Sequence, residues 1–76
     1  MTIAKKVLTG IKRLNNSING NPKYMLYFNY EVVRTPSDSM LAYKIDNSLI
    51  GKKLLITYHL TDKKKQAILD NFEIIN

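Results

Sequence analysis

The chain has 76 residues and no cysteine, and its 12 Lys and Arg against 6 Asp and Glu give a formal net charge of +6 at pH 7. A chain of this length predicts one small domain spanning residues 1–76, which buries only roughly 60% of its unfolded surface. Hydrophobic residues at 45% and charged residues at 24% argue against disorder along the whole chain. The lack of cysteine excludes disulfides and thiolate metal sites, and His59 alone cannot hold a metal ion.

The amino-terminal sequence MTIAKKVLTGIKRL predicts no targeting or membrane segment. Lys5, Lys6 and Gly10 interrupt its apolar residues, so it lacks the continuous apolar run of a signal peptide or a membrane span. We therefore expect a soluble, cytoplasmic protein that does not contact a membrane.

The positive charge is unevenly placed along the sequence. The first acidic residue is Glu31, and five basic residues precede it: Lys5, Lys6, Lys12, Arg13 and Lys23. Such asymmetry is typical of proteins that bind polyanions, because each phosphate neutralised by Lys or Arg releases counterions. The composition also fits the codon bias of an AT-rich genome, since Lys, Ile and Asn together make up 27 of the 76 residues.

The first half of the chain predicts three strands. Residues 4–14, AKKVLTGIKRL, change their alternating phase near Gly10, which predicts a bulge or sharp bend in one long strand that serves two regions of a sheet. Residues 23–28, KYMLYF, alternate with Leu26 and Phe28 on the inner face and Met25 and Tyr27 on the outer face. After a turn at residues 29–31, VVRT at 32–35 returns as a short third strand.

A helix is predicted next, within residues 35–46. Thr35 fits an N-cap, Pro36 the first helical position and Asp38 the third, which together resemble a capping box. Met40, Leu41 and Ile45 then form an apolar stripe at helical spacing.

Two further strands are predicted after Gly51. KKLLITYHL at residues 52–60 has Leu54, Ile56 and Tyr58 on one face, with Leu55 and His59 on the other. In the tail, Ile68, Asp70, Phe72 and Ile74 alternate as in a strand, and a helix over residues 63–72 is the alternative because Ile68, Leu69, Phe72 and Ile75 also fit helical spacing.

The predicted element order, three strands, a helix and two strands with a bent first strand, resembles the OB-fold. We therefore predict a mainly β protein, a small five-stranded OB-like barrel (β-β-β-α-β-β) with one short helix, and an SH3-like barrel is the alternative. Fold resemblance by itself does not establish function.

A local pattern resembles small uncharacterised proteins of bacteriophages and other mobile elements. These share N-S-x-x-G-N-P, then a basic residue and an aromatic. The matching residues here are Asn16, Ser17, Gly20, Asn21, Pro22, Lys23 and Tyr24, and residues 37–43 resemble the helix of that group. The resemblance covers roughly residues 11 to 61. It implies a barrel-like domain of mobile-element origin and brings no established activity.

The functional prediction is a non-enzymatic protein that binds single-stranded DNA or RNA. In an OB-like barrel, the loop after the first strand and the loop between the last two strands flank one ligand face, with the second and third strands as its floor. The predicted basic groove consists of Lys12, Arg13, Lys23, Arg34, Lys63, Lys64 and Lys65. Tyr27 is the predicted platform for base stacking, since exposed aromatics stack bases in a sequence-tolerant way.

We find no combination of nucleophile, base and orienting carboxylate in the sequence, so we expect neither enzyme activity nor a cofactor. The alternative function is a protein-interaction module, such as a phage factor that binds a host protein through Met25, Tyr27 and Leu55. An exposed edge at the third or fifth strand would also allow homodimerisation. The choice between DNA and RNA, the protein partner and the oligomeric state stay open.

Overall fold

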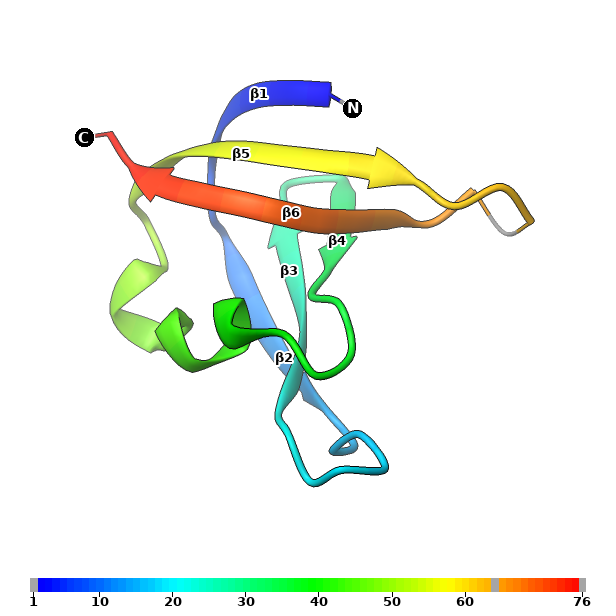
Figure 1. Ribbon diagram of the computed structural model, residues 1–76. Helices are drawn as coiled ribbons and strands as arrows, with labels where there is room; N and C mark the ends of the chain where they lie inside the picture. Colours follow the sequence, from blue (N-terminus) through cyan, green and yellow to red (C-terminus); the bar gives the residue numbers. More distant parts are fainter. Residues whose placement is uncertain (1, 64, 76) are drawn as a thin grey trace.

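Six strands form one mixed sheet in the computed structural model, which describes residues 2–63 and 65–75 (Figure 1). The strands are β1 (Thr2–Val7), β2 (Gly10–Leu14), β3 (Lys23–Phe28), β4 (Glu31–Arg34), β5 (Lys53–Leu60) and β6 (Ala67–Ile74). Two short 3-10 helices, η1 (Met40–Lys44) and η2 (Asn47–Leu49), lie between β4 and β5. The strand order is β1-β5-β6-β4-β3-β2, so the two ends of the sheet are consecutive in the sequence.

The segment that was predicted as one long first strand forms β1 and β2, and its backbone changes hydrogen-bond partner between them, at Leu8 and Thr9. Leu8 N donates to Lys52 O and Leu8 O accepts from Gly51 N, whereas Thr9 N donates to Tyr27 O. The prediction that this segment serves two regions of the sheet is confirmed, since β1 pairs with β5 and β2 with β3. The exchange precedes Gly10, where an added Cβ would meet only Tyr27 at 3.8 Å. A small side chain would therefore fit at position 10 in ordinary contact with Tyr27.

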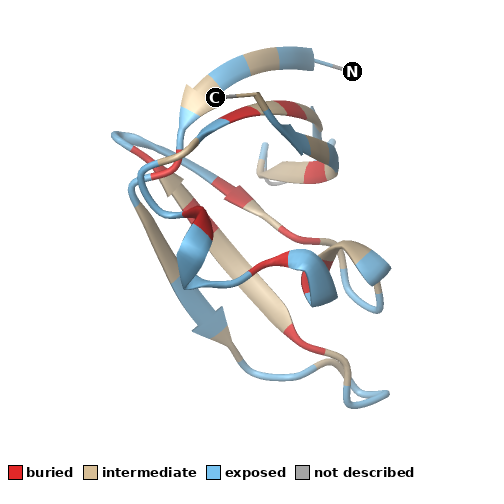
Figure 2. Ribbon diagram, turned by 90° about the vertical axis from the view of Figure 1, so that its left-hand side faces the viewer, coloured by how far each residue is buried: buried red, intermediate tan, exposed pale blue. Residues whose placement is uncertain are grey.

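The core lies between the crossing strands and the 3-10 helices. Leu26 and Phe28 are buried on β3, as predicted from its alternation, and Leu54 and Ile56 are buried on β5. In Figure 2 the buried residues are the red stretches of the ribbon, which are short and alternate with intermediate and exposed residues along the chain. The remaining residues of the main core cluster are Leu8, Val33, Ile45, Leu49 and Leu69.

The predicted helix within residues 35–46 is wrong, because the described residues contain no α-helix and η1 begins only after Ser39. Thr35 is buried and continues the pairing with β3: its N–H donates to Tyr24 O, and its hydroxyl accepts from Tyr24 N. That hydroxyl is therefore not free to cap a helix. Asp38 has a φ of +59°, a left-handed backbone that interrupts a helix, so the capping box does not form.

The tail forms a strand, β6, and the helix considered for residues 63–72 is wrong. Its pairing with β5 shifts between Thr57, opposite Asn71, and Tyr58, opposite Leu69, so Asp70 is an additional residue, as in a β-bulge. Because of this bulge, Leu69 and Phe72 both pack into the core although they are three residues apart.

The bulge also corrects the phase predicted for this strand. Leu69 is fully buried, whereas Ile68 is only half-buried, so the continuous alternation from Ile68 to Ile74 is wrong in its first half. A spacing of three between buried residues also explains why a helix fitted the same sequence.

The free edges of the sheet are not the predicted ones. Strand β4, which corresponds to the predicted third strand, pairs in parallel with β6 through Val33 opposite Ala67 and Arg34 opposite Ile68. The strands with one neighbour in the described part of the chain are β1 and β2.

No helix among residues 2–63 and 65–75 has the length and apolar composition needed to cross a bilayer.

The bulge in β6 predicts unequal costs for two neighbouring truncations. We expect Leu69→Ala to lower the free energy of unfolding by about 2 to 5 kcal/mol, because it leaves a cavity in the core. Ile68→Ala should cost less than about 1.5 kcal/mol, because that side chain lies on the other side of the strand. Urea denaturation followed by circular dichroism measures both values, and equal costs would contradict the bulge.

Candidate nucleic-acid interface

Four predicted site residues lie on one face of β2, β3 and β4: Lys12, Lys23, Tyr27 and Arg34. Lys12 pairs with Met25, and Met25 pairs with Arg34, so the three side chains stand in one row across the sheet. Tyr27 is on the same outer side of β3, two residues further along. The sheet thus places one cation on each side of Met25, Lys12 on β2 and Arg34 on β4.

A hollow of about 430 Å³ lies beside this row, between the outer side of β3 and β4 and the turn that joins β5 to β6. We call it the outer hollow. Its lining includes Met25, Arg34, Tyr58, Lys65 and Gln66, which come from four separate parts of the chain. In Figure 1 the β5–β6 hairpin extends past β4, and this extension forms one wall of the outer hollow.

The β5–β6 turn is held by its own hydrogen bonds. Thr61 N donates to Gln66 O, Lys65 N donates to Thr61 O, and the hydroxyl of Thr61 accepts from Gln66 N at 3.1 Å. Lys65 has a φ of +52°. These bonds fix the backbone that carries Lys65 beside Arg34.

One acidic residue, Glu31, also lines the outer hollow. Its Oε1 lies 2.7 Å from Nζ of Lys6 on β1. Because Lys6 is its partner, the negative charge of Glu31 is compensated locally, and Arg34 and Lys65 keep the wall of the hollow positive.

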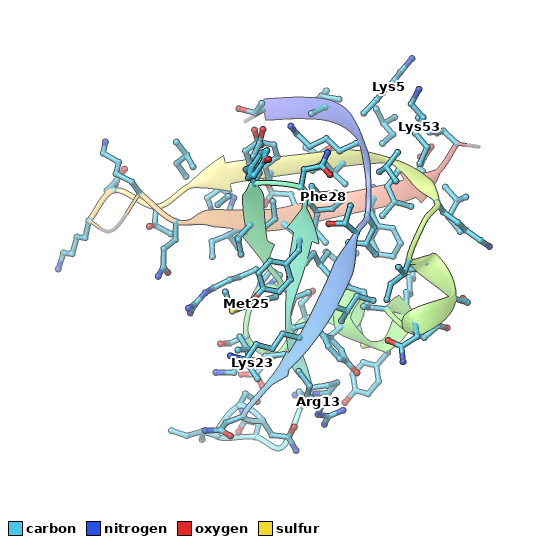
Figure 3. All side chains as sticks on the ribbon, turned by 180° about the vertical axis from the view of Figure 1, so that it is seen from behind. Lys5, Arg13, Lys23, Met25, Phe28 and Lys53 are labelled. Atoms are coloured by element: carbon cyan, nitrogen blue, oxygen red, sulfur yellow. The ribbon has the colours of Figure 1, made fainter. Side chains whose placement is uncertain are left out.

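Arg13 does not join this surface, although it was predicted to. Successive residues of a strand point to opposite sides, so Arg13 lies on the other side of β2 from Lys12. Its guanidinium lies 5.6 Å from the centre of the Tyr24 ring, and Nη2 donates to Asn16 Oδ1 at 2.7 Å. Figure 3 shows Arg13 on the opposite side of β2 from Lys23 and Met25. Its contacts support the fold of the β2–β3 loop.

The predicted aromatic platform, Tyr27, is half-buried and lies outside the lining of the outer hollow. Its hydroxyl donates to Met25 Sδ at 3.9 Å. Tyr58 lines the hollow instead, a residue that we predicted only as an inner position of a strand. Tyr58 packs against the edge of the core, and Leu60 continues the inner side of β5 beyond it and is 56% exposed. The length of this strand in the sequence could have indicated the position of Tyr58, because β5 continues beyond the residues that the core buries, Leu54 and Ile56.

The remaining predicted lysines are spread out. Lys23 is half-buried and lines a second hollow with Ser17, Ser37 and Asp38. Lys63 is exposed in the β5–β6 turn, and Lys64 lies outside the described residues. Of the predicted cations, Lys12, Lys23 and Arg34 therefore share the outer side of the sheet, and Lys65 lines the outer hollow from the β5–β6 turn.

The β2–β3 loop is hydrogen-bonded to Asp38, a residue that was predicted to lie in a helix. The carboxylate accepts from the hydroxyl of Ser17 at 2.5 Å, from Nδ2 of Asn21 at 2.8 Å and from Nδ2 of Asn19 at 3.1 Å. Asn21 Oδ1 in turn accepts from the hydroxyl of Tyr43. The side chains of Ser17, Asn19 and Asn21 thus bind an exposed carboxylate of the same chain, which accounts for these polar residues of the loop without any ligand.

These contacts change the acidity of Asp38. The hydrogen bond from Ser17, followed by those from Asn21 and Asn19, holds the pKa of the Asp38 carboxyl below its usual value. Each bond favours the ionised form because a carboxylate accepts hydrogen bonds from hydroxyl and amide donors better than a neutral acid does.

His59 lies on the opposite side of β5 from Tyr58 and so points away from the outer hollow. Its Nδ1 lies 2.8 Å from Asp70 Oδ1, at the bulge of β6. Residues 2–63 and 65–75 contain no group of three or more His, Asp or Glu side chains placed to hold a metal ion.

Comparison with known proteins gives no family. No protein-family model matches the chain, and neither a curated protein nor a solved structure matches it.

The link between Asp38 and the loop predicts a local response to acid. Because the folded pKa of Asp38 is lowered, its contribution to stability is present above the usual carboxyl pKa of about 4 and is lost as pH falls through the folded value. We expect the amide resonances of Ser17 to Asn21 to shift with a midpoint below pH 4, measured by NMR. In Asp38→Ala this transition should be absent, and a midpoint at or above about pH 4 would contradict the contacts.

Proposed function

We propose that this protein binds single-stranded nucleic acid at the outer hollow and along the adjoining face of β2, β3 and β4. The observation that carries the proposal is the convergence of Arg34 and Lys65 with Tyr58 and Met25 around one hollow. Cations that follow a phosphate chain and aromatic or thioether surfaces that contact bases are the components of sequence-tolerant single-strand binding.

The order of the strands supports an OB-like barrel as the setting of this surface. The two ends of the sheet, β1 and β2, are halves of one bent segment, and β4 pairs in parallel with β6. In OB-folds the ligand face lies on the second and third strands between the loops that follow strands one and four. Here those strands correspond to β3 and β4, and the second loop is the β5–β6 turn that carries Lys65.

Phosphates would contact Lys12, Arg34 and Lys65 in this proposal. Arg34 and Lys65 flank the outer hollow, and Lys12 extends the positive surface across β3. Counterion release at these side chains supplies affinity without sequence preference. The binding is non-enzymatic and needs no cofactor, and we propose a role in the cytoplasm of a host for a protein of mobile-element origin.

The interaction-module alternative has weaker support from the geometry. Met25 and Tyr27 share the outer side of β3, but Leu55 lies on β5 opposite Lys5 and Glu73. These three side chains were the anchors expected for one protein partner, and they do not lie in one row of the sheet. Met25 contributes instead to the outer hollow.

The first test is a salt titration with labelled single-stranded oligonucleotide. We expect binding at about 50 mM salt, with the logarithm of affinity falling linearly with the logarithm of salt concentration. Arg34→Ala should weaken binding to all sequences alike and reduce the slope by about one unit. Lys53→Ala is the matched control, because Lys53 is exposed at the other end of the sheet, away from Lys23 and Met25 (Figure 3). No binding by the unaltered protein, or equal effects of the two variants, would contradict the proposal.

The second test separates stacking from charge. Tyr58→Leu retains apolar volume but removes the aromatic face, so we expect it to weaken binding by roughly 1 to 3 kcal/mol while the salt slope stays unchanged. Tyr27→Leu should have a smaller effect, because Tyr27 does not line the outer hollow. Fluorescence anisotropy with the same oligonucleotide measures both, and thermal unfolding checks that each variant is folded. A larger loss for Tyr27→Leu would move the base platform to β3.

A further inference from the structure

Strand β1 has a neighbour on one side only. It pairs with β5 from Thr2 opposite Tyr58 to Val7 opposite Lys53, and it lies at one end of the strand order. Within residues 2–63 and 65–75, no strand pairs with its other edge. An unpaired edge presents N–H and C=O groups that can bind a further strand.

The hydrogen bonds of Leu8 show which backbone groups of β1 point to this free edge. Both polar groups of Leu8 bond to the segment before β5, at Lys52 and Gly51, whereas Thr9 N bonds to Tyr27 on the other side. Alternate residues of an antiparallel pair direct their N–H and C=O groups to the partner strand. The even-numbered residues of β1 therefore face β5, and the odd-numbered ones face the free edge.

The odd-numbered residues of β1 are Ile3, Lys5 and Val7, and all three are exposed. Ile3 is 67% exposed and Val7 is 42% exposed, with Lys5 between them. An added strand would meet an apolar, a cationic and an apolar side chain at alternate positions, because directly opposite residues in adjacent strands are neighbours on one face.

A cleft lies beside this edge. Its volume is about 400 Å³, and its lining includes Lys6 of β1 together with Phe28, Tyr30 and Glu31 around the β3–β4 turn. No residue of β5 lines it, so it is on the free side of β1. Tyr30 is fully exposed at the rim of this cleft.

The ion pair between Lys6 and Glu31 shows that a carboxylate approaches β1 from this side. Lys6 Nζ and Glu31 Oε1 are 2.7 Å apart, and the Glu31 side chain is 54% exposed. A carboxylate is thus accommodated beside Lys6, and the neighbouring Lys5, which is exposed and also lines the cleft, offers a second cation at this edge.

We propose that the free edge of β1 binds an extended acidic segment of a partner protein by strand addition. The segment would carry two apolar side chains, next to Ile3 and Val7, with a carboxylate between them opposite Lys5. Backbone hydrogen bonds would supply affinity, and this alternation would supply specificity. The inference goes beyond the proposed function, because it involves a peptide partner and the backbone of β1 instead of nucleic acid, although Glu31 lines both the cleft and the outer hollow.

A second copy of this chain is a poorer occupant of the same edge. Antiparallel pairing of two β1 edges centred on Lys5 would place two like charges directly opposite each other, which is destabilising. The net charge of +6 adds a general repulsion between copies. Both effects instead favour an acidic partner.

Hydrogen exchange followed by NMR tests the direction of the edge. The probe is a peptide of about seven residues with blocked ends. Threonine occupies every other position, and the positions between are valine, glutamate and valine, in that order. On adding the peptide to the full chain, we expect the amides of Ile3, Lys5 and Val7 to gain protection, while those of Ala4 and Lys6 are already protected by β5. Absence of binding at low salt, or protection confined to β3 and β4, would overturn the proposal.

Reversing the charge at Lys5 and on the peptide tests whether the edge selects an acidic partner. Lys5→Glu should weaken binding of the glutamate peptide roughly 5- to 10-fold, and a peptide with lysine in place of glutamate should then bind this variant better than it binds the unaltered protein. Lys12→Glu, on β2, is the matched control and should leave the preference of the protein for the glutamate peptide unchanged. Equal effects of the two variants would show attraction to net charge alone and would overturn the proposal, as would a dimer formed through β1 that excludes the peptide.

Discussion

The exchange of hydrogen-bond partners at Leu8 and Thr9 is the constraint on which the rest of the structure depends. Leu8 bonds to the segment before β5, and the next residue bonds to β3, so one short stretch of backbone joins the two ends of the sheet. Leu8 itself is fully buried, which anchors the bend in the core. Because β1 pairs with β5 and β2 pairs with β3 on either side of this bend, the outer sides of β1 and β3 form two separate surfaces.

The two proposed surfaces differ in the chemistry that they offer. Along β3 and β4, side chains would carry the recognition, since the outer hollow collects Arg34 of β4, Tyr58 of β5 and Lys65 of the β5–β6 turn, and β4 and β5 each have a neighbour on both sides. Along β1, the backbone carries it, because one edge of that strand is unpaired in the described part of the chain. A polyanion suits the first surface and an extended peptide suits the second, although both use lysine to attract negative charge.

Alternation in the sequence predicted the strands well where each strand keeps one phase. Leu26 and Phe28 on β3, and Leu54 and Ile56 on β5, are buried as their spacing indicated. The prediction failed where a side chain serves a distant segment. Thr35 resembled a helix cap but bonds to Tyr24, and Asp38 resembled a first-turn acid but holds the β2–β3 loop. Arg13 and Lys12 appeared equivalent until strand register placed them on opposite sides of β2. Such partners are set by tertiary contacts, which local propensity does not contain.

The pairing of early strands with late ones also bears on how the chain acquires its structure during synthesis. β1 pairs with β5, and β4 pairs with β6 through residues that lie more than thirty positions apart. Each of these contacts closes a long loop before it gains any pairing energy, which slows folding. While a ribosome holds the last strand, β4 lacks its parallel partner and the β2–β3–β4 meander lacks the cover of Leu69. The domain therefore completes its fold only once β6 has been synthesised and can pair with β4.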